Sequence, residues 1–296
     1  MSIIGEISAL ITAFFWSGSS ISFAEATKRA GSVLVNVARL IIAAFLLLIT
    51  ILIAQISLQL SSTQYTCLVV SGIIGLTFGD TFLFKAYQQL GARVTSLIMS
   101  FAPAVSALLA FIFLGEVLSI QDIMGILITI AGIAIVVLEK KENVSLRRTF
   151  FNIGLLMAFL GAVGQGSGLV FAKMAFNEGD INGFAATFIR IAAGLITLFP
   201  IALISGRLKN PFKTFSADKQ AFKFTMLGAL MGPYFGITFS LIAISHTKVG
   251  IAATIMAIVP ILMLPLVKYF YKETITKRAV VGAFVAVAGV ALLFLF

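Results

Sequence analysis

Charged residues are scarce in this sequence, and so are the side chains that hold metal ions or form disulfides. Only 11% of the 296 residues are charged, against roughly 25% in a soluble domain. A single Cys (Cys67) and a single His (His246) exclude a disulfide framework and a zinc site of the usual composition. The G-x4-G-K-[ST] pattern of a P-loop is also missing, so ATP is not expected to be the direct energy source. The sequence predicts neither a metal ion nor a cofactor.

The sequence consists mainly of long runs of apolar residues. Hydrophobic residues make up 60% of the chain, and the mean hydropathy is +1.12. The runs are 18 residues or longer, close to the roughly 20 that span a bilayer core. They lie at approximately 3–24, 33–54, 65–86, 94–115, 121–138, 153–173, 184–204, 222–244, 250–271 and 279–296. Only helices or closed barrels satisfy the backbone in lipid, and barrel alternation is absent. We therefore predict an all-α membrane protein with ten transmembrane helices.

Two segments of the chain repeat each other. Pro103–Glu116 returns as Pro260–Glu273, 157 positions later, and Pro and Glu are 13 positions apart in both copies. The same offset relates four pairs of glycines: Gly75 and Gly232, Gly79 and Gly236, Gly125 and Gly282, Gly132 and Gly289. A match without gaps over about sixty residues indicates an internal duplication.

The duplication divides the chain into residues 1–143 and 144–296, each with five predicted helices. Because five is odd, the second half would enter the bilayer from the opposite face. The two halves would then be inverted repeats, related by a pseudo-twofold axis in the membrane plane. Such halves are typical of transporters that work by alternating access.

Basic residues are distributed unevenly between the predicted loops. Of the 21 Lys and Arg residues, 17 fall on one predicted face and only Lys173 and Lys248 on the other, while Arg39 and Arg190 lie inside helices. Since cytoplasmic loops carry the excess of Lys and Arg, we expect the basic face in the cytoplasm and both termini outside, in a plasma (inner) membrane. The Lys and Arg residues of one membrane face therefore account for the net charge of +10. Because the charge is explained in this way, no nucleic-acid partner is predicted.

A set of motifs recurs in order along the chain. The first helix contains W-x-G at Trp16–Gly18, the second contains an Arg, and P-x12-E is followed by G-x6-G; the last three features return in the second half. Over its whole length the chain resembles the ten-helix EamA-type members of the drug/metabolite transporter superfamily. The resemblance implies a secondary transporter of small metabolites, amino acids among them, with a central cavity between the halves. Two features depart from it: the termini expected outside, and the positions of Glu6 and Glu25 near the ends of the first helix, where related small multidrug exporters use a carboxylate at its middle.

Asp80 is the most informative single residue, because it lies inside a predicted helix within the stretch G-L-T-F-G-D-T. A carboxylate at membrane depth is costly and is by default a functional candidate. It could bind a substrate ammonium or a proton. Alternatively, it could form an ion pair with Lys85 or Arg39, or it could lie near the end of its helix. The corresponding residue of the second half is Ile237, so the two halves differ at this point.

Polar side chains on several predicted helices complete a candidate substrate site. Trp16 and Ser20 are four apart and share a face of the first helix, and Gln165 lies on the matching helix of the second half. A Trp beside hydroxyls and an amide suits a small amphipathic ligand. Hydroxyls in lipid also bond their own helix backbone, which is the alternative for Thr77 and Thr238. The predicted substrate-binding residues are Trp16, Ser20, Thr77, Asp80, Gln165, Tyr234 and Thr238.

A second group of residues is predicted to support or gate the helices. An Arg in each half could bind a substrate carboxylate, but its presence in both halves favours a structural role. The G-x3-G pairs let backbones approach closely, the repeated prolines are expected to kink their helices, and the repeated Glu residues are expected to bond neighbouring helix N-termini. The group comprises Arg39, Arg190, Gly75, Gly79, Gly232, Gly236, Pro103, Pro260, Glu116 and Glu273.

Together these features favour a secondary transporter, an exporter or exchanger, that moves amino acids or similar amphipathic metabolites across the bilayer as a functional monomer. Buried groups of both charges suit a zwitterion better than a polyanion, which would need a cluster of Lys and Arg. One alternative is an intramembrane enzyme, but the chain lacks a Ser–His, paired-Asp or metal constellation, so no enzymatic activity is predicted. The other alternative is a non-transporting receptor or scaffold.

Overall fold

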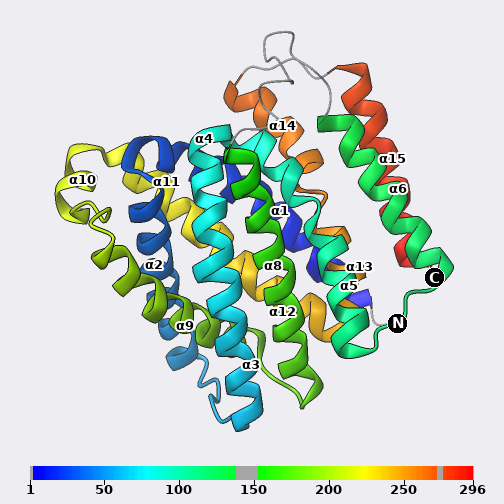
Figure 1. Cartoon of the computed structure of the whole chain (residues 1–296), viewed down its shortest axis with the longest axis horizontal. Helices are drawn as coiled ribbons and strands as arrows, with labels where there is room; N and C mark the ends of the chain where they lie inside the picture. Colours follow the sequence, from blue (N-terminus) through cyan, green and yellow to red (C-terminus); the bar gives the residue numbers. More distant parts are fainter. Residues whose placement is uncertain (1–2, 138–152, 272–275, 296) are drawn as a thin grey trace.

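The computed structural model describes the backbone of residues 3–137, 153–271 and 276–295, and this part of the chain is helical without any strand (Figure 1). The first half contains α1 (Ile3–Ala30), α2 (Ser32–Ile53), α3 (Ser62–Gly72), the π-helix η1 (Ile73–Gly79), α4 (Asp80–Met99), α5 (Ala102–Leu114) and α6 (Ile120–Val137). The second half contains α8 (Ile153–Asn177), α9 (Gly183–Ile204), α10 (Pro211–Ala217), α11 (Lys219–Ala229), the π-helix η2 (Leu230–Gly236), α12 (Ile237–His246), α13 (Val249–Met256), α14 (Val259–Tyr271) and α15 (Lys277–Leu295).

Seven helical stretches in these described ranges are long and apolar enough to cross a membrane. They are Ile3–Ala30, Ser32–Ile53, Ser62–Ala92, Ile153–Asn177, Gly183–Ile204, Lys219–His246 and Val249–Leu266. Large apolar side chains such as Ile53, Phe45, Ile196 and Phe284 are exposed on the outside of the molecule, which is the surface that lipid would cover. The chain is therefore an all-helical, multi-pass membrane protein, as the sequence predicted.

Two of the predicted continuous helices, at 94–115 and 250–271, are interrupted. α5 begins one residue before Pro103, and α14 begins one residue before Pro260. Proline has no N–H to donate, which costs nothing in a first turn but breaks a hydrogen bond in a helix interior. In place of the predicted kinks, each proline lies in the first turn of a new helix. α4 is also interrupted at Gly91, whose φ of 75° is a value that glycine adopts without steric cost.

Two π-helical segments lie at matching positions in the two halves. η1 and η2 are 157 residues apart, which is the offset of the sequence duplication. η1 packs against α8 and α9, and η2 packs against α1 and α2. A π-turn widens the helix and is frequently found at functional sites. Asp80 follows η1 directly, and Ile237 follows η2, so the acidic residue marks this position in the first half alone.

The first helix of each half lies at the centre of the molecule. α1 contacts α4, α11, α12 and η2, and α8 contacts α3, α4, α5 and η1; Figure 1 shows both running through the middle of the bundle, while α6 and α15 pair at its edge. Glycines bring α8 against η1: a Cβ added to Gly164 would lie 2.4 Å from the Cα of Gly79, and one added to Gly168 would lie 3.0 Å from the Cα of Gly75. The backbones of α8 and η1 are therefore in direct contact.

The glycines of η2 contact aromatic side chains of α1. A Cβ added to Gly236 would lie 2.5 Å from Nε1 of Trp16, and one added to Gly232 would lie 3.0 Å from Cε2 of Phe23. The matching G-x3-G pairs thus differ in their partners, since the first pair meets another backbone and the second meets bulky rings. Trp16 and Phe23 are held in place by this packing.

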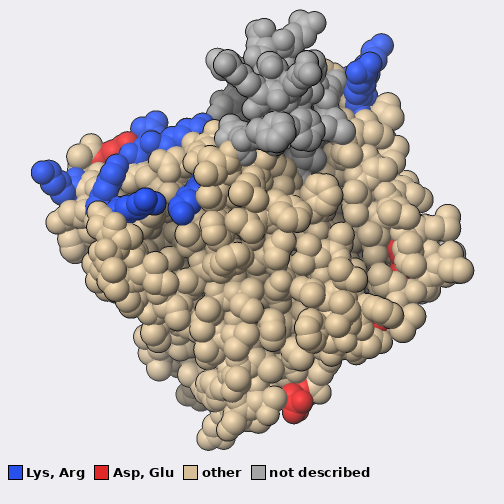
Figure 2. Space-filling model, in the orientation of Figure 1, with Lys and Arg blue, Asp and Glu red and all other residues tan. Residues whose placement is uncertain are grey.

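Basic side chains gather on one side of the molecule. In Figure 2 the Lys and Arg side chains lie along the top, over α10 and the beginning of α11 and above α15, and the lower part of the view is almost free of them. Exposed basic residues of these elements include Lys213, Lys219 and Lys223. Figure 1 places both chain ends below the middle of the same view, away from the basic side.

Candidate functional site

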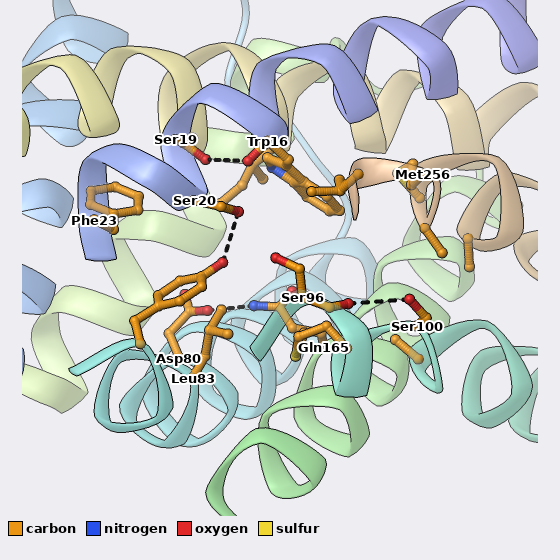
Figure 3. A pocket seen from close by; sticks show the side chains of 18 of the residues that line it. Trp16, Ser19, Ser20, Phe23, Asp80, Leu83, Ser96, Ser100, Gln165 and Met256 are labelled. Atoms are coloured by element: carbon orange, nitrogen blue, oxygen red, sulfur yellow. Dashed lines mark hydrogen bonds between the residues drawn. The ribbon is translucent and has the colours of Figure 1, made fainter. Parts of the chain in front are cut away.

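A cavity lies where α1, α4 and α8 meet the ends of α5 and α13 (Figure 3). Its volume of about 120 Å³ would hold roughly ten water-sized groups, which is the scale of one amino acid. Four predicted substrate-binding residues line it: Trp16, Ser20, Asp80 and Gln165. Arg39, Pro103 and Gly232, from the second predicted group, line it as well. Both halves of the chain therefore contribute to its wall.

Asp80 is the charged centre of this wall. Its side chain is 2% exposed and forms an ion pair with Arg39 through Oδ2. Its other oxygen, Oδ1, accepts a hydrogen bond from Nε2 of Gln165, as Figure 3 shows. Of the two ion-pair partners that the sequence suggested, the structure has Arg39; the amine of Lys85 lies 5.5 Å from the ring centroid of Phe82 instead. The carboxylate joins α2, α4 and α8.

The guanidinium of Arg39 is held on several sides. Its Nε donates to Oδ1 of Asn36 at 3.0 Å. Its Cζ lies 4.5 Å from the ring centroid of Phe84 and 5.6 Å from that of Phe23, within the range of a cation–π interaction. Arg39 is therefore a fixed counter-charge for Asp80.

Hydroxyl groups line the wall beside the carboxylate. Ser20 and Tyr87 are hydrogen-bonded to each other at 2.9 Å, and Ser100 donates to the backbone oxygen of Ser96 at 3.1 Å (Figure 3). The remaining lining is largely apolar and includes Leu83, Met99, Met256 and Val259. The cavity thus combines one ion pair, an amide and hydroxyls with an apolar surface, which suits a small amphipathic ligand.

Several lining residues were not predicted from the sequence. Tyr87 lies seven positions after Asp80 on α4, and residues seven apart share a helix face, so this spacing is the signal that could have identified it. Ser96 lies beyond the break at Gly91, where helical spacing no longer applies. Met256 is the last residue of α13. The sequence predicted one continuous helix at 250–271 and therefore gave no indication of this end.

Three predicted substrate-binding residues lie outside the cavity lining. Thr77 donates to the backbone oxygen of Gly194 at 3.1 Å and so joins η1 to α9. Thr238 donates to the backbone oxygen of Tyr234, one turn back in its own helix, at 2.6 Å. The hydroxyl of Tyr234 lies 2.7 Å from that of Thr50 and joins η2 to α2. Thr77 and Tyr234 therefore connect helices, whereas Thr238 bonds the backbone of its own helix.

Arg190 is placed differently from Arg39, although both lie in the second helix of their half. It is almost completely buried, it is not among the residues that line the cavity, and its Nε has no hydrogen-bond partner among the described residues. The guanidinium lies beside η1, since a Cβ added to Gly75 would be 3.1 Å from its Nη2. Of the two arginines, only Arg39 pairs with Asp80 in a described contact.

Polar contacts also join the α5–α6 connection to the α12–α13 connection. Oε2 of Glu116 accepts a hydrogen bond from the N–H of Val249, the first residue of α13, at 2.8 Å. Nearby, Nζ of Lys248 lies 3.1 Å from Oδ2 of Asp122. Burial raises the pKa of Glu116, and the N–H of Val249 partly offsets this effect. Glu273, the predicted counterpart of Glu116, lies outside the described residues.

The arrangement can bind and orient a ligand through charge, hydrogen bonds and apolar contact. Within the described residues there is no group of three or more His, Cys, Asp or Glu side chains that could hold a metal ion. Asp80 is the carboxylate of the wall, and it is already paired.

Comparison with known proteins identifies the family of the chain. Residues 3–138 and 152–295 match the EamA-like transporter family. An uncharacterized transporter from Archaeoglobus fulgidus is 20% identical over 219 residues, which are 74% of each chain. A crystal structure of a protein 16% identical in sequence superposes with a TM-score of 0.72 over 96% of this chain and 95% of the other, so the two share a fold. This chain belongs to the EamA-like transporter family.

Proposed function

We propose that the protein is a secondary transporter, an exporter or exchanger, that carries amino acids or similar small amphipathic metabolites by alternating access. The observation that carries this proposal is the ion pair of Arg39 and Asp80 on the wall of an otherwise largely apolar cavity. A zwitterion offers both charges to such a wall and keeps the sum of charges at zero. Membership of a transporter family and the missing P-loop pattern support transport without direct use of ATP.

The architecture that we propose for this cycle is ten transmembrane helices in two inverted repeats, residues 1–143 and 144–296. The matching positions of η1 and η2 support it, and so do the matching helix starts before Pro103 and Pro260. The family also matches the chain in two stretches, one in each half. Two related halves on either side of one cavity provide the two similar gates that alternating access needs.

We further propose that the basic side faces the cytoplasm of a cell with this protein in its plasma membrane, and that both termini lie outside. The gathering of Lys and Arg on one side (Figure 2) supports this orientation. Since residues of a single chain line the cavity, a monomer is expected to be sufficient for transport. The proposed partners are the lipid bilayer and a small-molecule substrate.

Efflux from proteoliposomes tests the proposal. Liposomes with the purified protein are loaded with a mixed pool of amino acids and other small metabolites, and the external solution is followed by mass spectrometry against protein-free liposomes. We expect a defined subset of amino acids to leave faster when the protein is present. Release of no component, with the protein shown to be folded and present in both orientations, would contradict the proposed transport of amino acids.

A further inference from the structure

Both oxygens of Asp80 are covered in this structure. Arg39 occupies Oδ2 and Gln165 occupies Oδ1, and the residue is 2% exposed although it lines the cavity. A ligand in the cavity can therefore reach the carboxylate only after one of the two donors has moved. Which donor can move decides what the site recognises.

The two donors are held very differently. Arg39 is fixed by Asn36 and by the rings of Phe84 and Phe23. The Gln165 side chain is half-buried, and its contact with Asp80 is the one side-chain hydrogen bond that it forms within the described part of the chain. Gln165 is thus the donor that can leave, and its departure would open Oδ1 to the cavity.

We propose that the amide of Gln165 is a stand-in for a substrate ammonium, which displaces it from Oδ1 of Asp80 during binding. This proposal rests on the proposed function and names the part of the site that selects for the amine. Gln165 is then a specificity-determining residue. It covers the carboxylate of Asp80 in the ligand-free protein, and only a stronger hydrogen-bond donor displaces it. Arg39 stays on Oδ2 throughout.

The site selects an ammonium over a hydroxyl because the two differ in strength as hydrogen-bond donors to Asp80. Both donors bond an ionised carboxylate, but the ammonium carries a full positive charge and adds a Coulomb attraction that the neutral amide of Gln165 does not have. An ammonium can therefore displace the neutral amide with a net gain. A hydroxyl cannot, because it exchanges one neutral donor for another. The tethered amide is also a strong competitor, since its local concentration at Oδ1 is high.

Charge balance adds a second condition. The charges of Arg39 and Asp80 cancel, so a simple amine would bring one uncompensated positive charge to a largely apolar cavity, which is unfavourable. A zwitterion brings a carboxylate with the ammonium and leaves the sum at zero. The expected ligands are therefore amino acids, in preference both to amines without a carboxylate and to 2-hydroxy acids.

The test compares ligand pairs that differ only in the amine. Dissociation constants for L-leucine, L-phenylalanine and their 2-hydroxy acid analogues are measured on the purified full-length protein by calorimetry, for wild type and Gln165→Ala. Losing the competing hydrogen bond from the amide to the charged carboxylate should make the variant bind the better of the two amino acids about tenfold more tightly. Its binding of the 2-hydroxy acids should change less than about twofold, because they do not use Oδ1.

Ser167→Ala is the matched control. Ser167 lies two positions further along α8 and donates to the backbone oxygen of Val163 in its own helix. The Ser167→Ala variant should bind all four ligands like wild type.

An Asp80→Asn background provides a second control. In this background, Gln165→Ala should have no further effect on amino-acid binding. Weaker amino-acid binding by Gln165→Ala, or equal changes for both ligand classes, overturns the proposal while amino-acid transport stands. If wild type neither binds these amino acids nor releases any amino acid from the mixed pool, both the proposal and the proposed function fail.

Discussion

Arg39 and Asp80 form an ion pair that joins α2 to α4 on the wall of the cavity, with both side chains at most 5% exposed. Gln165 adds a hydrogen bond from α8 to the same carboxylate. Breaking a buried ion pair by removing one partner leaves an uncompensated charge, whereas replacing both partners with apolar residues is often neutral. The contribution of the pair to folding can therefore be measured apart from its contribution to transport.

Asp80→Leu alone should lower the free energy of unfolding by about 3–5 kcal/mol, because it leaves the guanidinium of Arg39 buried without a counter-charge. The double variant Arg39→Met/Asp80→Leu should recover most of this loss. Thermal unfolding in detergent measures both, and efflux from proteoliposomes measures transport. We expect the double variant to fold and to transport no amino acid. Transport at the wild-type rate by the double variant would show that the pair serves folding only.

Arg190→Met should not share the destabilising effect of Arg39→Met. Arg190 is buried, and its Nε has no hydrogen-bond partner among the described residues, so its removal takes away an unsatisfied donor, and Met fills much of the same volume. We expect the free energy of unfolding of Arg190→Met to equal that of wild type or to exceed it by about 1–2 kcal/mol. Arg39→Met, which leaves Asp80 unpaired, should unfold more easily. Equal destabilisation of the two variants would contradict the different roles that their contacts indicate.

The sequence predicted the bounds of some helices closely because the bilayer sets their length. The predicted runs 33–54 and 184–204 differ by one residue from α2 and α9 at their beginnings, and by at most one at their ends. Two breaks and the short helix α10 were not predicted. A helix that ends before a proline and a helix that is only kinked there can have the same sequence, and only the hydrogen bonds of the folded chain distinguish them.

The candidate site was predicted in part, and the π-helices explain why two of the predicted residues, Thr77 and Tyr234, lie outside the cavity lining. Trp16, Ser20 and Gln165 lie in regular α-helix, where a spacing of four places side chains on one face, and all three line the cavity. Thr77 and Tyr234 lie inside η1 and η2. One additional residue in a turn rotates the following side chains by about 100° relative to an α-helix. Helical spacing therefore could not indicate which way these two side chains point.

The close approach of α8 to η1 can be tested with two glycines of the same helix. A Cβ added to Gly164 would lie 2.4 Å from the Cα of Gly79, whereas the nearest atom to one added to Gly161 would be 3.3 Å away, at Leu83. Gly164→Ala should therefore lower stability by about 1–3 kcal/mol through overpacking, and Gly161→Ala by less. Thermal unfolding of the two variants gives the order. A larger loss for Gly161→Ala would contradict the packing of α8 on η1.

Glu116 should make stability depend on pH. Burial raises its pKa above the ordinary value of 4.5, although the N–H of Val249 and the charges of Lys173 and Lys248 act in the other direction. A group that binds its proton more tightly in the folded state stabilises the fold below pH 4.5, and this contribution is lost as the pH rises through the folded-state pKa.

Glu116→Gln cannot titrate, so wild type should lose stability relative to this variant as the pH rises from about 4 to about 7. The measurement is the difference in Tm between the two proteins across this range, with Glu178→Gln, an exposed carboxylate after α8, as the control for removing one negative charge. Because the hydrogen bond from the Val249 N–H needs only an acceptor oxygen, the Gln side chain can keep it, and the comparison isolates the proton. A difference in Tm that is constant with pH would show that the Val249 N–H and the two lysines cancel the effect of burial, and a difference that moves in favour of wild type would show that they outweigh it.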